Sequence, residues 1–141
     1  MKQKLFTAAI ILLGCFIGTA QTGQISITIS DIKKVEGDLY FLLYDEQDGF
    51  PKEKEKALKV GRLSSYDDSA SYTFENVPYG VYAVAFFQDE NENGKLDSNL
   101  IGIPKEPVGA SNMTSFGKPS YRKCKFELDQ PQKSMKLKFV L

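Results

Sequence analysis

The sequence contains no histidine, and it has only two cysteines, Cys15 and Cys124. Without histidine, the protein cannot use a Ser-His-Asp triad, a histidine zinc site or an imidazole general base. Cys15 lies in an apolar N-terminal run that we expect to be removed, which leaves Cys124 without an internal disulfide partner. A secreted domain without a disulfide needs its rigidity from a good core, from a metal, or from both.

The chain also lacks an excess of charge of either sign, because it carries 18 basic and 18 acidic residues. It has no basic patch and no arginine cluster, so we expect no nucleic-acid partner. Its 141 residues suffice for one domain and not for two. A hydrophobic content of 42% and an aromatic content of 12% indicate a folded core rather than a disordered chain.

The first 20 residues have the pattern of a secretory signal peptide, with cleavage best placed after Ala20. The basic start "MKQK" precedes an apolar run that is short for a membrane span and has no basic stop on its far side. We therefore expect no membrane span, and an exported protein, periplasmic or extracellular, whose single domain covers residues 21–141. An alternative is a lipoprotein anchored at Cys15, because "LLGC" resembles a lipoprotein box, although the apolar run continues beyond it.

Seven short runs in residues 21–141 predict β-strands. In the first run, Ile25, Ile27 and Ile29 alternate with polar residues, as in a half-buried strand. Two runs are apolar on both faces and predict central strands. The predicted strands cover residues 24–30, 39–45, 57–63, 69–75, 81–88, 121–128 and 134–141. Short strands separated by Gly and Pro turns indicate an all-β fold, an antiparallel β-sandwich of about seven strands, immunoglobulin-like or transthyretin-like.

Two segments do not fit the strand pattern. One is the charged connection at residues 46–56, where residues 51–59 could form one or two exposed helical turns. The other is residues 89–120, which contain no convincing strand. Compact domains rarely contain a structureless connection beyond about 15 residues unless it is functional or held in place. The second segment is therefore where the sequence points to function.

The stretch "DENENGKLD", residues 89–97, places oxygen-bearing side chains at alternate positions around a glycine. This is the spacing of positions 1, 3, 5, 6, 7 and 9 of an EF-hand loop, in which position 7 contributes its backbone carbonyl. Around a hard cation the chain must curl, so that every second side chain points inward. The spacing predicts one calcium ion bound by Asp89, Asn91, Asn93, the Lys95 carbonyl and Asp97.

The loop departs from an EF-hand at its end, because position 12 is Leu100 rather than a bidentate Glu. A predicted strand precedes it and a proline-rich segment follows. Further ligands would come from Glu106, Asp45, Asp48 or water. The alternative is a metal-free loop held by Asx-turns and an Asn-Gly turn, which the same composition favours.

Residues 74–113 resemble a family of small secreted bacterial proteins that is catalogued only as a domain of unknown function. The shared pattern is P-x-G-x-Y-A, then D-x-N-x-N-G-K-x-D, then G-I-P-K-E and S-N. It falls here on Pro78 to Ala83, Asp89 to Asp97, Gly102 to Glu106, and Ser111 with Asn112. Members usually carry His where Gln88 stands here. The resemblance implies a secreted bacterial domain and no particular activity.

These features predict a secreted, non-enzymatic β-sandwich domain with a calcium-binding loop and a structural or binding role. Its partner would be an unknown protein, peptide or glycan. The alternative is a metal-independent module that recognises a carbohydrate or a peptide through residues 89–113. A hydrolase is a further alternative, but without histidine its general base would have to be a carboxylate, Lys or Tyr.

The N-terminal pattern predicts that the mature protein begins at Gln21 and carries no lipid. The intact mass of protein isolated from its native host measures this directly. A mass that corresponds to an acylated chain beginning at Cys15 would contradict the prediction and place the protein on a membrane surface.

Overall fold

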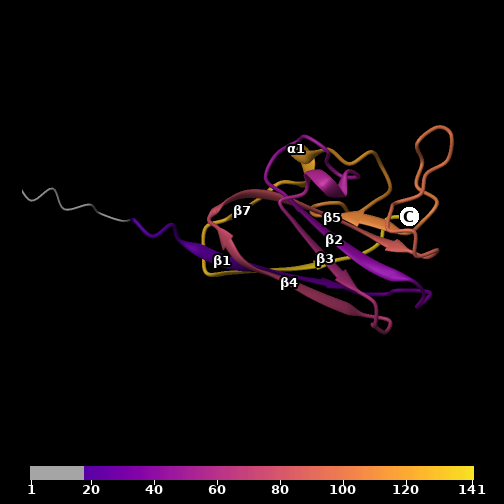
Figure 1. Ribbon diagram of the computed structural model, residues 1–141, viewed down its shortest axis with the longest axis horizontal. Coiled ribbons are helices and arrows are strands. Elements are labelled where there is room, and N and C mark those ends of the chain that lie inside the picture. The colour runs from indigo at the N-terminus through magenta and orange to yellow at the C-terminus, as the bar shows by residue number, and fades with distance from the viewer. Residues whose placement is uncertain (1–17) are drawn as a thin grey trace, which may run out of the picture.

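A computed structural model of the chain describes residues 18–141. Cys15 and the predicted signal peptide, apart from residues 18–20, lie outside the described residues. The described part has two packed sheets, of three and five strands, which confirms the β-sandwich (Figure 1). The elements are β1 Thr22–Ile29, β2 Asp38–Tyr44, η1 Lys54–Lys56, β3 Lys59–Leu63, β4 Ala70–Pro78, β5 Gly80–Asp89, β6 Val108–Ala110, α1 Tyr121–Cys124, β7 Phe126–Leu128 and β8 Gln132–Leu137.

The smaller sheet has the order β4-β1-β8, and the larger has the order β3-β2-β5-β6, with β7 also paired to β5. All pairs are antiparallel except β1 with β8, which is parallel. The prediction of an antiparallel sandwich was wrong for that pair. The chain leaves the larger sheet after β7 and joins the smaller one as β8, so hairpin geometry does not set the direction of β8.

The core between the sheets follows from the alternation of the strands. Ile25, Ile27 and Ile29 of β1 are fully buried against the inward residues of β2 and β5. The inward residues from the larger sheet are Leu39, Phe41, Leu43, Tyr82, Val84 and Phe86. Burying an aliphatic or aromatic side chain of this size stabilises a fold by about 1.5–3 kcal/mol, so this cluster holds the two sheets together.

The central strands β2 and β5 are also buried on their outer face, as their apolar composition predicted. Irregular segments and short elements cover that face instead of a third sheet. Phe50 from the 46–56 connection, Leu96 from the long loop, and Tyr121 of α1 pack against Tyr40, Tyr44 and their neighbours. Figure 1 shows α1 on the side of the larger sheet that faces away from β1 and β4.

The strand predictions hold for most strands and fail in the segments that cover the outer face of the larger sheet. Residues 121–128 are not one strand but a helical turn, α1, followed by β7. The turn forms because the Ser120 carbonyl accepts hydrogen bonds from the N–H groups of both Lys123 and Cys124. β6 lies inside the long segment in which no strand was predicted. The predicted exposed turns at residues 51–59 contain the short 3₁₀ helix η1.

Within residues 18–141, no helix is long and apolar enough to cross a membrane.

Cys124 should behave as an inert, buried thiol. It is fully buried beside Ala83 and Ala110, and burial raises the pKa of its thiol above the usual value, which disfavours the reactive thiolate. In a Cys15→Ser background, a thiol-reactive dye should label the unfolded chain quickly and the folded chain at least tenfold more slowly. As a matched control, a cysteine introduced at the exposed position Ser115 should label quickly in both states. Fast labelling of Cys124 in the folded chain would contradict the packing of α1.

Candidate functional site

Asp89 ends β5 and is fully buried, although its side chain is a carboxyl group. It lies opposite Asp38, the first residue of β2. The Ser64 hydroxyl and the Arg62 guanidinium hold the pKa of Asp38 below its usual value, so that carboxylate has its own counter-charge. Gly37 has a φ of +65°, and a Cβ there would lie 1.9 Å from the Asp89 carbonyl oxygen. Gly37 therefore allows its backbone segment to approach the backbone at Asp89 closely, at the start of the loop.

The Asp89 carboxylate folds the loop back on itself. Its Oδ1 accepts a hydrogen bond from the Asn93 N–H at 3.1 Å, and its Oδ2 accepts one from the Gly94 N–H at 2.7 Å. Gly94 has a φ of +76°, a conformation that glycine adopts without steric cost. The curl that the sequence predicted around residues 89–94 is thus present.

Glu106 closes the loop from the other side. Its Oε1 accepts the Glu90 N–H at 3.0 Å and its Oε2 accepts the Asp97 N–H at 2.9 Å. The side chain is only 5% exposed. Burial raises the pKa of Glu106 above its usual value, and the negative charges of Asp89 and Asp97 add to this, while the two backbone N–H groups act in the opposite direction. The carboxylates of Asp89, Asp97 and Glu106 are therefore all part of this loop closure.

The side chains of Asn91, Asn93 and Asp97 meet on the inside of the curl. The Asn91 and Asn93 amide nitrogens both donate to Oδ2 of Asp97, at 2.6 and 2.9 Å. The amide oxygen of Asn91 accepts the Asn93 N–H at 3.3 Å, and the amide oxygen of Asn93 accepts the Lys95 N–H at 2.9 Å. These are Asx-turns, so the self-capping that the sequence suggested as an alternative is also present.

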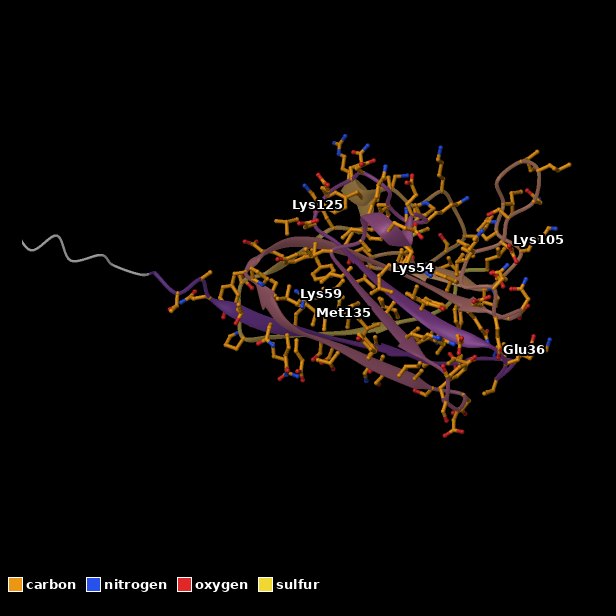
Figure 2. All side chains as sticks on the ribbon, viewed as in Figure 1. Glu36, Lys54, Lys59, Lys105, Lys125 and Met135 are labelled. Atoms are coloured by element: carbon orange, nitrogen blue, oxygen red, sulfur yellow. The ribbon has the colours of Figure 1, made fainter. Side chains whose placement is uncertain are left out.

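Lys54 of η1 ties the loop to the outer face of the larger sheet. Its Nζ donates to the Gly94 carbonyl at 2.8 Å and lies 4.9 Å from the centre of the Tyr40 ring. Sequence reasoning missed this contact, because the run "KEKEK" at residues 52–56 has the pattern of a solvated surface. Figure 2 labels Lys54 over the larger sheet and Lys105 near the foot of the turn that projects beyond the loop.

All five predicted ligand residues therefore lie in one curled loop, and Glu106 joins them. The other two suggested ligands do not. Asp48 forms an ion pair with Lys56 at 3.0 Å, and Asp45 is exposed beside Tyr121, whose hydroxyl donates to the Asp45 carbonyl at 2.9 Å. Glu92, between two of the predicted ligands, is exposed.

Comparison with known proteins places the sequence in a bacterial family. The model of the family described as "Uncharacterized protein conserved in bacteria (DUF2141)" matches residues 27–136, which is most of the described domain. The chain belongs to this family. This member of DUF2141 is a β-sandwich in which the long loop follows the central strand β5.

A weaker likeness concerns fibronectin type III domain-containing protein 1 from Margaritifera margaritifera, which is 26% identical over 92 residues. The match covers 64% of this chain but only 12% of that much longer protein. No solved structure matched significantly.

Several residues of the sequence pattern found in residues 74–113 of this DUF2141 member have structural roles outside the loop. The Tyr82 hydroxyl donates to the Pro78 carbonyl at 2.7 Å and stabilises the corner between β4 and β5. Ser111 Oγ donates to the Cys124 carbonyl at 2.6 Å, and Asn112 Nδ2 donates to the Lys125 carbonyl at 2.9 Å, so the S-N pair fastens α1 to the sheet.

Gln88, which stands where members usually carry His, is buried at the end of β5. Its amide nitrogen donates to the carbonyls of Lys34 and Glu36 and to the Tyr66 hydroxyl, at 2.7–2.9 Å. Gln88 therefore cross-links the strand end to the connection before β2.

Removal of the Glu106 carboxylate should destabilise the domain. Glu106→Ala leaves the N–H groups of Glu90 and Asp97 without their acceptor, which should lower the free energy of unfolding by about 2 kcal/mol. The neighbouring Lys105→Ala, at an exposed position, should change it by less than about 0.5 kcal/mol. Urea unfolding of both variants in chelator measures the difference. Equal stabilities would show that Glu106 does not hold the loop.

Proposed function

We propose that this protein is an exported, non-enzymatic domain whose loop at residues 89–97 binds one calcium ion and so stiffens a binding or structural surface. The observation that carries the proposal is the concentration of uncompensated negative charge at the loop. Asp89 is fully buried, and none of Asp89, Asp97 and Glu106 forms an ion pair with a Lys or Arg of residues 18–141. Buried carboxylates are normally paired with a cation or coordinate a metal.

The residues present fit a calcium ion, provided that amide and carbonyl oxygens contribute. Within residues 18–141, no three Asp, Glu, Cys or His side chains are close enough together to hold a metal by themselves. Calcium, however, accepts carboxylate, amide, carbonyl and water oxygens in flexible geometry. Rotation of the Asn91 and Asn93 amides by 180° would bring their oxygens to the places where their nitrogens now meet Asp97.

The carbonyl of Lys95 is available for the same ion, because it accepts no backbone hydrogen bond from residues 18–141. In this proposal Asp89, Asn91, Asn93, the Lys95 carbonyl and Asp97 hold the ion. Glu106 fixes the two ends of the loop, because its two oxygens accept the N–H groups of Glu90 and Asp97.

A second candidate function is a recognition module that uses residues 89–113 without a metal and binds a carbohydrate or a peptide. The observation in its favour is that the amide N–H groups of Asn91 and Asn93 donate to Asp97 and shape the loop without a metal. Sensitivity to chelators separates the two candidates.

Calcium should raise the melting temperature of the protein. Two carboxylate ligands and no bidentate Glu imply a dissociation constant of about 10⁻⁴–10⁻³ M. At ten times that concentration, the ion should add about 1.4 kcal/mol to the free energy of unfolding. For a domain of this size, that corresponds to a rise of about 5 °C. Thermal unfolding in chelator and in 10 mM calcium measures it, and magnesium should substitute poorly.

Two variants that each remove one negative charge test which residue is responsible. Asp97→Asn should abolish the calcium-dependent rise in melting temperature, whereas Glu92→Gln, in the same loop but exposed, should keep it. If the wild-type melting curve is the same in chelator and in calcium, the calcium proposal is wrong and the recognition module becomes the better candidate.

A further inference from the structure

The irregular cover on the outer face of the larger sheet leaves a partly open cavity of about 560 Å³. Its floor is formed by Ala85 and Phe87 of β5 and by Val108 and Ala110 of β6. Its walls are formed by residues 50–52, Leu96, residues 101–104, Met113 and residues 116–119. The volume lies within the range of about 300–1,000 Å³ that is usual for sites of small organic ligands.

Apolar side chains at the mouth of the cavity are exposed to water. Ile101 is 80% exposed, Phe116 is 59% exposed and Ile103 is 39% exposed, and all three line the cavity. Exposed apolar groups that gather at a hollow mark a binding surface, because a ligand that covers them removes their area from water. Leu100, next to Ile101, is fully exposed at the tip of the same turn.

The turn that forms one wall is stiff. Oδ1 of Asn99 accepts the N–H groups of Ile101 and Ile103 at 3.1 and 2.9 Å, and the Asn99 N–H donates to the Ile103 carbonyl at 2.8 Å. Figure 1 shows this turn projecting beyond the body of the sandwich. A wall that is already ordered costs little conformational entropy when a ligand binds.

The charges at the cavity indicate what the ligand carries besides its apolar part. Only two lining residues have polar side chains, Lys52 and Lys118, and both are cations. Lys52 Nζ is held at the rim by the Gly102 carbonyl at 3.0 Å and by Ser98 Oγ at 3.5 Å. An apolar lining with cations at its rim suits a ligand that joins an apolar chain to one anionic end group, and a carboxylate is the simplest such group.

We propose that this cavity binds a single-chain fatty carboxylate. The alkyl chain lies over Ala85, Phe87 and Val108 beneath Ile101 and Phe116, and the carboxylate pairs with Lys52 and Lys118. The inference goes beyond the calcium proposal and does not depend on it, since no predicted metal ligand lines the cavity. All measurements are therefore made in chelator, so that failure of one proposal leaves the other intact.

The first test is a chain-length series measured by titration calorimetry below the micelle concentrations. Octanoate, decanoate and dodecanoate should bind with affinities that rise about fourfold for each buried methylene, or about 15-fold per step of two, until the cavity is full. Dodecylammonium should bind at least tenfold more weakly than dodecanoate. Affinities that do not depend on chain length, or equal binding of the two dodecyl compounds, would overturn the proposal.

The second test uses two pairs of variants. Val108→Trp fills the floor and should weaken dodecanoate binding at least tenfold, whereas Val60→Trp, at a half-exposed position on β3 outside the cavity, should not. Lys118→Glu, at an exposed position, should lose dodecanoate and gain dodecylammonium, whereas Lys136→Glu on β8 should bind as the wild type does. Since Lys118→Glu does not touch the core, it remains informative if Val108→Trp does not fold. Unchanged binding by Lys118→Glu would refute the pairing with the carboxylate.

Discussion

The central strands β2 and β5 are apolar on both faces, and this constraint determines how the rest of the chain is arranged. One face packs against β1 and β4 in the sandwich core. The other would expose Tyr40, Leu42, Tyr44 and Phe87 to water if nothing covered it. Since residues 18–141 form no third sheet, connections make the cover. Phe50, Leu96 and Tyr121 each come from a different irregular segment or short element. The long loop is thus part of the packing of the domain.

This arrangement explains why one segment can combine a polar curl with an apolar wall. In residues 89–97, Asp89, Asn93 and Asp97 face the inside of the curl, while Leu96 packs onto the outer face of the sheet. Glu106 then returns the chain to the strand end by accepting N–H groups from both sides of the curl. The price of this closure is a second buried carboxylate near Asp89, and the raised pKa of Glu106 reflects it.

The sequence predicted what depends on local pattern and missed what depends on contacts between distant segments. The alternation of Ile25, Ile27 and Ile29 and the two-sided apolar runs located β1, β2 and β5 correctly, because burial follows directly from these patterns. The strand predicted over residues 121–128 was wrong in its first half. Cys124 and Leu128 are both buried, but Cys124 ends the helical turn α1 and only residues 126–128 form a strand. Ser111 and Asn112 accordingly bond the carbonyls of Cys124 and Lys125. β6 has only three residues, too few to show a period.

For the loop, the spacing in the sequence was enough to predict that the five oxygen-bearing residues lie in one curl, because Asx-turns and a glycine with positive φ are local features. The roles of Lys54 and Glu106 depend on tertiary packing, so spacing could not define them. Leu96 connects the loop to the cavity, since it lies between the predicted ligands Lys95 and Asp97 in the chain and lines the cavity wall. Any event that orders the curl therefore also fixes one wall of the cavity. If calcium and a fatty carboxylate both bind and both favour this position of Leu96, each raises the affinity for the other by the same factor.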